Sequence, residues 1–166
     1  MLILGIDPGL AETGWGIIEM ANGKKKKLKK TDGLTLVDYG CIKTLVGHDL
    51  SKRLLVLKNE LQEIIIKHRP DCMAMEQLFF GRNAKTAMIV GLARGVMMVT
   101  AAEESVPILE YQGLTVKLNL SGDGRCSKSG MQSVVSKALY LKFTPRPQHA
   151  SDALAVAIYH AMKNQK

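Results

Sequence analysis

The order of extended and helical segments constrains the fold of this chain more than any other feature. Residues 2–8, 15–20 and 34–43 have the apolar, extended character of strands. Asp-Pro-Gly ends the first segment and Asn22-Gly23 follows the second, and both are turn signals. Beyond these segments, helical patterns alternate with short apolar runs. This order predicts an α/β fold with a mixed five-stranded sheet flanked by helices, in which the first three strands form an antiparallel meander.

The remainder of the chain is predicted to supply four helices and two strands. Apolar residues at helical spacing predict the helices, and Pro70 ends the first of them. A glycine-containing stretch near the C-terminal third has the composition of a loop. We expect helices at 50–68, 83–103, 128–142 and 149–163, strands at 72–75 and 106–110, and the loop at 112–127.

The predicted helix at 83–103 is apolar on almost every side, so it must be buried on most sides. Gly91 and Gly95 permit close backbone approach. Two arrangements satisfy this pattern: a central helix in the core of a monomer, or a helix that packs the sheet with one face and a second copy of the chain with another. A two-fold dimer would place two sites symmetrically.

Composition indicates a basic protein with reduced thiols. The 23 lysines and arginines exceed the 15 acidic residues, and the formal net charge of +8 favours a polyanionic partner such as nucleic acid, although many basic proteins bind none. Three widely spaced cysteines contain no C-x-x-C pair, which argues against a zinc site. The apolar run 1–6 is too short for a signal peptide or a membrane span. We therefore expect one cytoplasmic domain over residues 1–166.

Four side chains that can bind metal stand at the ends of apolar elements. Asp7 follows the first strand, and Glu76 follows the strand at 72–75. His149 and Asp152 lie three residues apart at the start of the last helix, so both point to one face. Strand ends and a helix N-terminus can meet at one rim of an α/β sheet. The sequence thus predicts a cluster of Asp7, Glu76, His149 and Asp152.

Such a cluster suits phosphodiester cleavage, which needs a nucleophilic water and a stabilised leaving oxygen. Two divalent cations about 3.5–4 Å apart provide both and bind hard oxygen ligands, and an imidazole in place of one carboxylate suits manganese better than magnesium. Each position alone also has a structural explanation: Asp7 as a turn former, Glu76 as a helix cap, Asp152 as an early-turn residue and His149 as a capping or surface residue. The functional interpretation rests on all four together.

These residues lie within a series of longer sequence blocks that covers nearly the whole chain. The blocks are ILGIDPG at 3–9, TGWG at 13–16, EQ at 76–77, FFGRN at 79–83, ARGV at 93–96, VK at 116–117, Gly122, Gly124, Arg125, Lys128 and HASDALA at 149–155. In this order, the blocks resemble the RuvC-type Holliday-junction resolvases. The first block alone is weak evidence, because actin-like ATPase domains open similarly, but the joint match is specific.

The resemblance implies a ribonuclease-H-like fold and a homodimer that resolves four-way DNA junctions by paired symmetric nicks. It implies that Asp7, Glu76 and Asp152 are catalytic acids that bind two Mg²⁺ or Mn²⁺ ions per site. His149 stands where many relatives have Asp and others have His, so it would be the fourth ligand. A branch-migration helicase complex is a further implied partner.

Several residues are candidates for DNA contacts. Phe79 matches the family's stacking aromatic, although one ring of the Phe79–Phe80 pair is expected in the core. Cations on the loops can neutralise phosphates, although each could equally belong to a solvated loop. The same applies to the six lysines at 24–30. The candidates are Phe79, Arg82, Asn83, Lys117, Arg125 and Lys128.

Three other functions share parts of this pattern. A noncatalytic module that binds branched DNA would keep the fold and the basic loops, but the four intact ligand positions argue against it. A nuclease of the same fold could act on RNA, but the loops around Phe79 and Lys128 favour junction DNA. An actin-like ATPase would need a second lobe and a further phosphate loop, which this chain lacks.

Overall fold

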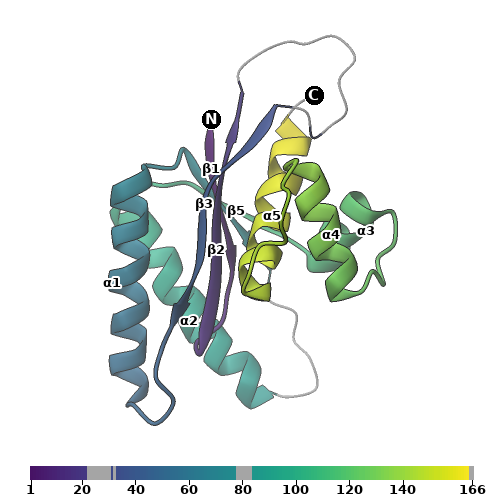
Figure 1. Cartoon of the computed structure of the whole chain (residues 1–166). Coiled ribbons are helices and arrows are strands. Elements are labelled where there is room, and N and C mark those ends of the chain that lie inside the picture. Colours follow the sequence, from purple (N-terminus) through teal and green to yellow (C-terminus); the bar gives the residue numbers. More distant parts are fainter. Residues whose placement is uncertain (22–30, 32, 78–83, 165–166) are drawn as a thin grey trace.

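The computed structural model describes residues 1–21, 31, 33–77 and 84–164. A central sheet separates two layers of helices (Figure 1). In chain order the elements are β1 (Leu2–Asp7), β2 (Glu12–Met20), β3 (Leu34–Lys43), α1 (Leu50–His68), β4 (Cys72–Glu76), α2 (Ala84–Glu103), β5 (Ile108–Tyr111), α3 (Gly113–Ser121), α4 (Lys128–Ala138) and α5 (Gln148–Asn164).

The five strands form one mixed sheet in the order β3-β2-β1-β4-β5, which confirms the predicted class. Strands β1, β2 and β3 pair antiparallel as the expected meander, with Asp7 opposite Gly14. Strands β1, β4 and β5 run parallel, and Ile6 pairs with Met75. Because β1 and β4 run in the same direction, their last residues, Asp7 and Glu76, reach the same edge of the sheet.

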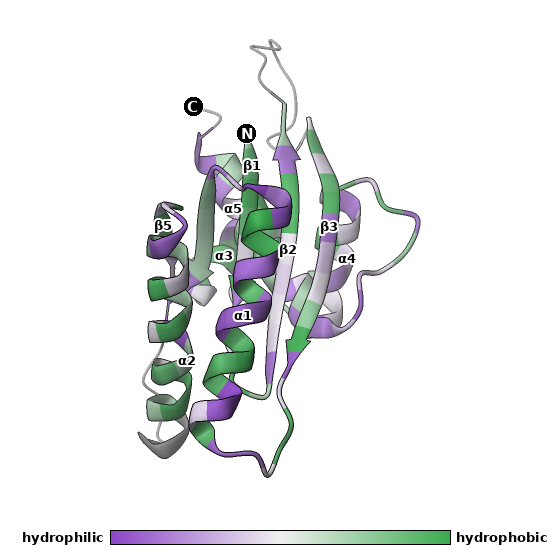
Figure 2. Cartoon of the chain, turned by 90° about the vertical axis from the view of Figure 1, so that its left-hand side faces the viewer, coloured by the Kyte–Doolittle hydropathy of each residue, from purple (hydrophilic) through white to green (hydrophobic). Residues whose placement is uncertain are grey.

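Each face of the sheet has its own hydrophobic core. Helices α1 and α2 cover one face, while α5 covers the other with α3 and α4 outside it (Figure 1). Figure 2 shows the apolar residues of α1 and the largely apolar α2. None of the helices in the described part of the chain combines the length and the apolar character that crossing a bilayer requires. The core beneath α5 includes Ile3, Ile18, Met131, Val135, Leu154 and Ile158, and the core beneath α1 and α2 includes Leu4, Ile17, Leu57, Leu61, Met73 and Met97.

Helix α5 lies directly against the backbone of β1 and β2. A Cβ atom at Gly5 would come within 2.1 Å of the Ala153 carbonyl oxygen, and one at Gly14 within 1.9 Å of the His149 carbonyl oxygen. Gly16 leaves the corresponding space for Leu154. Since any larger residue at these positions would push α5 outward, the three glycines set the distance between α5 and the end of β1.

The structure corrects two expectations about the C-terminal third. Residues 113–121, expected as loop, form α3, a short helix that ends where Gly122 adopts a left-handed conformation and donates its N–H to the Leu118 carbonyl. Val116 is the one buried residue of α3, so the helix needs no apolar stripe, and its sequence shows none. Helix α4 ends at Ala138 rather than 142, because Tyr140 is left-handed (φ 54°) and its neighbour Leu141 donates to the Ser136 carbonyl.

Other elements match their predicted positions to within three residues, and α1 and β3 match fully. Strand β2 begins at Glu12, three residues before the predicted start at Trp15, so it includes the Thr-Gly pair. Strand β5, Ile108–Tyr111, begins two residues later and ends one residue later than predicted. The lysine run at 24–30 lies outside the described residues.

A buried polar cluster joins α5 to β4 and β5. The His160 ring, almost fully buried, is hydrogen-bonded at Nδ1 to the Tyr111 hydroxyl at 2.7 Å. Its Nε2 lies 3.3 Å from the Cys72 sulfur and 2.8 Å from the Asn164 side-chain nitrogen. Burial lowers the pKa of His160 and raises that of Cys72 to about 11, so both groups are neutral at neutral pH. The cluster therefore orients α5 through neutral hydrogen bonds.

We expect Tyr111→Phe to lower the free energy of unfolding by about 1–3 kcal/mol, because it leaves a buried ring nitrogen of His160 without its partner. Urea denaturation of the metal-free protein measures this loss. Tyr159→Phe is the matched control. It removes a hydroxyl from the ring that packs edge-on against Tyr111 but leaves the hydrogen bond between Tyr111 and His160 in place. Equal stability of Tyr111→Phe and the unsubstituted protein would contradict the orienting role of the cluster.

Candidate active site

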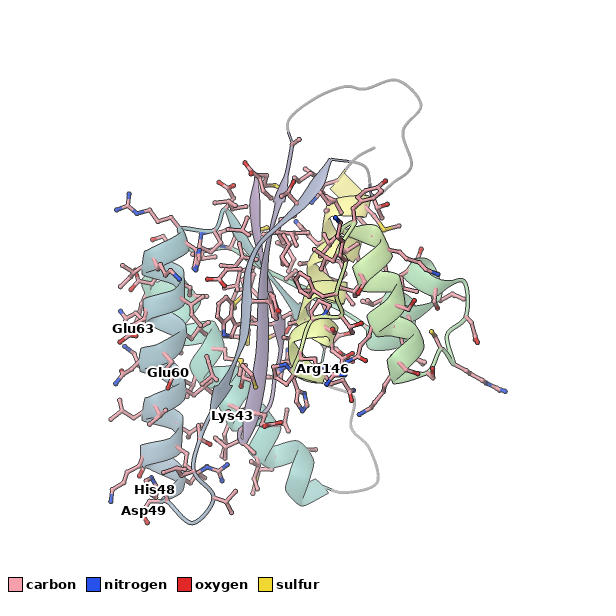
Figure 3. The ribbon with its side chains drawn as sticks, viewed as in Figure 1. Lys43, His48, Asp49, Glu60, Glu63 and Arg146 are labelled. Atoms are coloured by element: carbon pink, nitrogen blue, oxygen red, sulfur yellow. The ribbon has the colours of Figure 1, made fainter. Side chains whose placement is uncertain are left out.

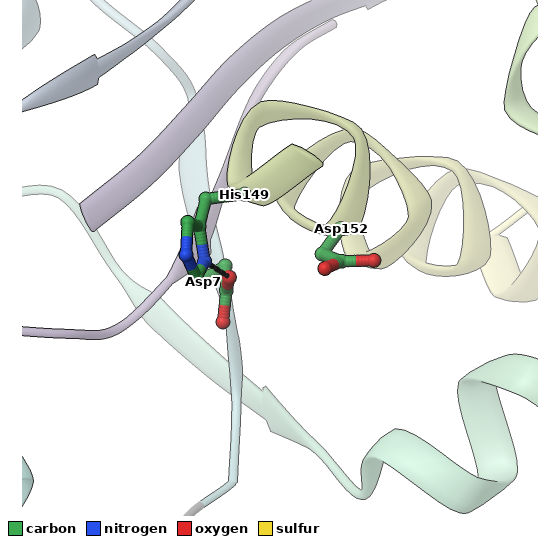
Figure 4. A group of neighbouring side chains, drawn as sticks. All are labelled: Asp7, His149 and Asp152. Atoms are coloured by element: carbon green, nitrogen blue, oxygen red, sulfur yellow. Dashed lines mark hydrogen bonds and ion pairs between the residues drawn. The ribbon is translucent and has the colours of Figure 1, made fainter. Parts of the chain in front are cut away.

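The candidate site lies at the edge of the sheet where β1 and β4 end and α5 begins. Figure 4 shows Asp7 at the end of its strand beside His149 and Asp152 in the first turns of α5. Asp7 Oδ2 lies 2.7 Å from His149 Nδ1, although 142 residues separate the two along the chain. One ligand atom from each of Asp7, His149 and Asp152 falls within 4.8 Å of the others.

This set of atoms fits a divalent cation. Two carboxylates and one imidazole are ligands that Mn²⁺ and Mg²⁺ accept, with the imidazole favouring Mn²⁺. The side chains are only partly accessible, with 19% of Asp7 and 40% of His149 exposed. The carboxylate of Asp152 also accepts a hydrogen bond from Gln148 Nε2 at 3.2 Å, which orients it. The structure thus brings together three of the four predicted ligands.

Glu76, the fourth predicted ligand, lies outside this group of three, but the charges of Asp7 and Asp152 act on its carboxylate. Arg94 of α2 donates to the Glu76 backbone carbonyl and pairs with Glu110, so it fixes the end of β4. The Glu76 carboxylate lies next to Gly113, where a Cβ atom would come within 2.0 Å of Oε1. Position 113 therefore leaves room for this carboxylate at the start of α3.

Burial and neighbouring carboxylates raise the proton affinity of Asp7 and Glu76. Burial raises the pKa of Asp7, the charge of Asp152 raises it further, and His149 and Lys128 oppose the shift. Burial likewise raises the pKa of Glu76, and so do the charges of Asp7 and Asp152. A site that holds several partly buried carboxylates together is costly without a compensating positive charge. Divalent cations would supply that charge.

Two of the basic residues predicted to contact DNA act on carboxylates of the site. Lys117 on α3 acts electrostatically on Glu76, and Lys128 at the start of α4 acts on Asp7; both lower the pKa of the carboxylate concerned. Arg125 is exposed on the loop between these helices, where its backbone N–H donates to Asp123 Oδ1. The other candidate DNA contacts, Phe79, Arg82 and Asn83, lie outside the described residues.

Sequence reasoning missed four residues that shape the site: Arg94, Gly113, Gln148 and Glu12. Glu12 Oε2 lies 3.5 Å from His149 Nε2, and its other oxygen lies 3.0 Å from Lys43 Nζ. Lys43 lowers the pKa of Glu12. Only Gln148, directly before the predicted ligand His149 and four residues from Asp152, had a signal in local spacing. The other three act through tertiary contacts.

A mixed α/β sheet whose parallel strands bring carboxylates to one edge, beside a helix that adds a histidine and a further carboxylate, defines the ribonuclease-H-like fold of a class of nucleases. A solved structure of Thermus thermophilus RuvC has this fold: it superposes with a TM-score of 0.85 and 34% identity, over 99% of this chain and 95% of that one. A T. thermophilus RuvC structure in complex with a Holliday junction substrate matches with a TM-score of 0.84 and 30% identity, over the same shares of both chains.

Sequence comparison identifies the family. The model of the crossover junction endodeoxyribonuclease RuvC family matches residues 3–160. The RuvC enzymes of Pelotomaculum thermopropionicum and Chloroflexus aurantiacus are 45% and 46% identical to this chain, in each case over 97% of it and 93% of the relative. The chain belongs to the RuvC family of crossover junction endodeoxyribonucleases, and it is a nuclease.

We expect Glu76→Gln to raise the melting temperature of the metal-free protein at neutral pH. The raised pKa of Glu76 means that the folded state retains its proton to higher pH than the unfolded state, so ionisation of this group destabilises the fold as pH rises above about 4. The gain should disappear below that pH, where both states are protonated. Thermal denaturation across this range measures it.

The same variant should lose most of the stabilisation by Mn²⁺, which for the unsubstituted protein is about 2.7 kcal/mol at a hundredfold excess over Kd. Glu60→Gln, an exposed position on α1 (Figure 3), is the control and should retain it. Full Mn²⁺ stabilisation of Glu76→Gln would show that Glu76 is not a ligand.

Proposed function

We propose that residues 1–166 form one nuclease domain that resolves four-way DNA junctions by metal-dependent hydrolysis of backbone phosphodiesters. The observation that carries this proposal is the convergence of Asp7, His149 and Asp152 within 4.8 Å, with Glu76 in their electric field. Family membership supports the substrate, because the relatives are crossover junction enzymes and a T. thermophilus relative is in complex with a Holliday junction substrate.

In this proposal Asp7, Glu76, His149 and Asp152 hold two Mg²⁺ or Mn²⁺ ions. When bound, the ions supply Lewis-acid stabilisation of the charge on the phosphate and leaving oxygen, and they align in-line attack by water. The chain contributes a rigid frame: Asp7 and Glu76 come from adjacent strands, and His149 and Asp152 come from the first turns of one helix. Fixed ligands of this kind need no reorganisation during the reaction.

Lys117 and Lys128 face the substrate in this proposal. Each acts electrostatically on a carboxylate of the site, so each is also placed to neutralise a phosphate that enters it. Arg125 on the exposed loop would contact the backbone farther from the scissile bond. We assign Phe79, Arg82 and Asn83 to DNA contacts from the family resemblance alone.

A homodimer would explain paired nicks, and helix α2 offers a surface for it. Ala93 and Met97 on its inner side are buried in the core, whereas apolar residues on the outer side remain exposed. Within the described part of the chain, no atom lies within 4 Å of a Cβ added at Gly91 or Gly95, so the backbone is open to a close partner there. The exposed fractions on the outer side are 63% for Met88, 42% for Leu92 and 56% for Val99.

Strand cleavage of a synthetic four-way junction and of a matched linear duplex tests the function. We expect paired symmetric nicks on the junction with Mg²⁺ or Mn²⁺ and none with chelator. Asp7→Asn should abolish cleavage yet retain junction binding, because it removes a ligand without changing the basic surface. Tight junction binding without nicking under any metal would instead support a noncatalytic branched-DNA-binding module.

We expect the double variant Leu92→Glu, Val99→Glu to be monomeric in sedimentation velocity experiments, because it places charges on the proposed dimer surface. Coordinated nicking of the two strands should be lost with the dimer. Val46→Glu, which adds a charge at an apolar position that is 86% exposed in the loop before α1, is the control. A dimer that survives the double substitution would place the interface elsewhere.

A further inference from the structure

The ring of His149 lies between two carboxylates, only one of which belongs to the proposed metal site. Asp7 Oδ2 is 2.7 Å from Nδ1, and Glu12 Oε2 is 3.5 Å from Nε2. A neutral imidazole carries a proton on one nitrogen and a lone pair on the other. The ring therefore has two tautomers: one carries the proton on Nδ1 and donates it to Asp7, and the other carries it on Nε2, the nitrogen that lies nearest to Glu12.

A cation bound between Asp7 and the ring nitrogen of His149 that faces it requires the second tautomer. Nδ1 is the nitrogen that faces Asp7, so its lone pair must be free to bind the ion, and the proton must then lie on Nε2. Glu12 is the carboxylate next to that nitrogen. In metal sites, a carboxylate that accepts the second N–H of a histidine ligand fixes its tautomer and increases its basicity.

We propose that Glu12 is a positioning residue that accepts the Nε2 proton of His149 and thereby directs the Nδ1 lone pair towards the divalent cation. This inference rests on the proposed metal site. It assigns to Glu12 a function that depends on the presence of histidine at 149, since an aspartate there would have no second N–H to donate.

The sheet holds Glu12 in place for this function. Glu12 is the first residue of β2 and pairs across the strands with Lys43, the last residue of β3. Their side chains form an ion pair at 3.0 Å through Oε1, which leaves Oε2 for His149. Figure 3 shows Lys43 and Arg146 at the end of the sheet where α5 begins. Lys43 thus anchors the carboxylate without occupying the oxygen that faces the ring.

Isothermal titration calorimetry with Mn²⁺ tests the inference on the DNA-free protein. We expect Glu12→Ala to weaken Mn²⁺ binding by about tenfold, the lower end of the effect of losing such a partner. In a His149→Asp background the same substitution should have a much smaller effect. Glu12→Gln retains an acceptor oxygen and should lose less affinity than Glu12→Ala.

Glu19→Ala is the control for net charge, because Glu19 is exposed at the far end of the same strand. Equal losses for Glu12→Ala in both backgrounds, or for Glu12→Ala and Glu12→Gln alike, would mean that Glu12 acts only by its charge and would overturn the inference. So would unchanged affinity in Glu12→Ala. Two results would contradict the proposed metal site itself, and the inference with it. One is that the unsubstituted protein binds no Mn²⁺, and the other is that Asp7→Asn binds Mn²⁺ as tightly as the unsubstituted protein does.

Discussion

The contact between α5 and the glycine surface of β1 and β2 determines the rest of the site. Side chains larger than hydrogen at Gly5 and Gly14 would overlap the backbone of Ala153 and His149. Gly14 is also the pairing partner of Asp7. The position that lets α5 approach the sheet therefore stands beside the carboxylate that its first turn must meet. A separation larger by one methyl group would move His149 and Asp152 out of reach of a cation shared with Asp7.

The close approach has an electrostatic cost that the surrounding fold offsets. Burial and mutual repulsion raise the pKa of Asp7 and Glu76, so the metal-free site opposes folding. Packing on both faces of the sheet and the neutral hydrogen bonds of His160 stabilise the fold and offset this cost. These contacts do not involve the charged carboxylates of the site. A site of this kind gains stability when it binds cations, which is a physical reason for high metal affinity.

The sequence predicted the sheet, and it predicted a cluster of which the structure brings Asp7, His149 and Asp152 together, because the signals for both are local. An apolar run that ends in an acid, as at Asp7 and Glu76, is visible in a few residues. Helix α3 was missed because a single buried residue, Val116, leaves no stripe. The role proposed for Glu12 could not be predicted for a different reason. It depends on the strand register that brings Glu12 opposite Lys43 and on the packing of α5, and local sequence spacing reveals neither.

Helix α2 links the proposed dimer surface to the proposed site. On its inner side, buried Arg94 donates to the backbone carbonyl of Glu76 and pairs with Glu110. Its outer side carries the exposed residues Leu92 and Val99. If two copies meet through these outer sides, α2 connects the two-fold interface to the end of β4 through the contacts of Arg94 with the Glu76 carbonyl and with Glu110. The spacing between the two sites would then be set by rigid elements, as symmetric cleavage of a two-fold junction requires.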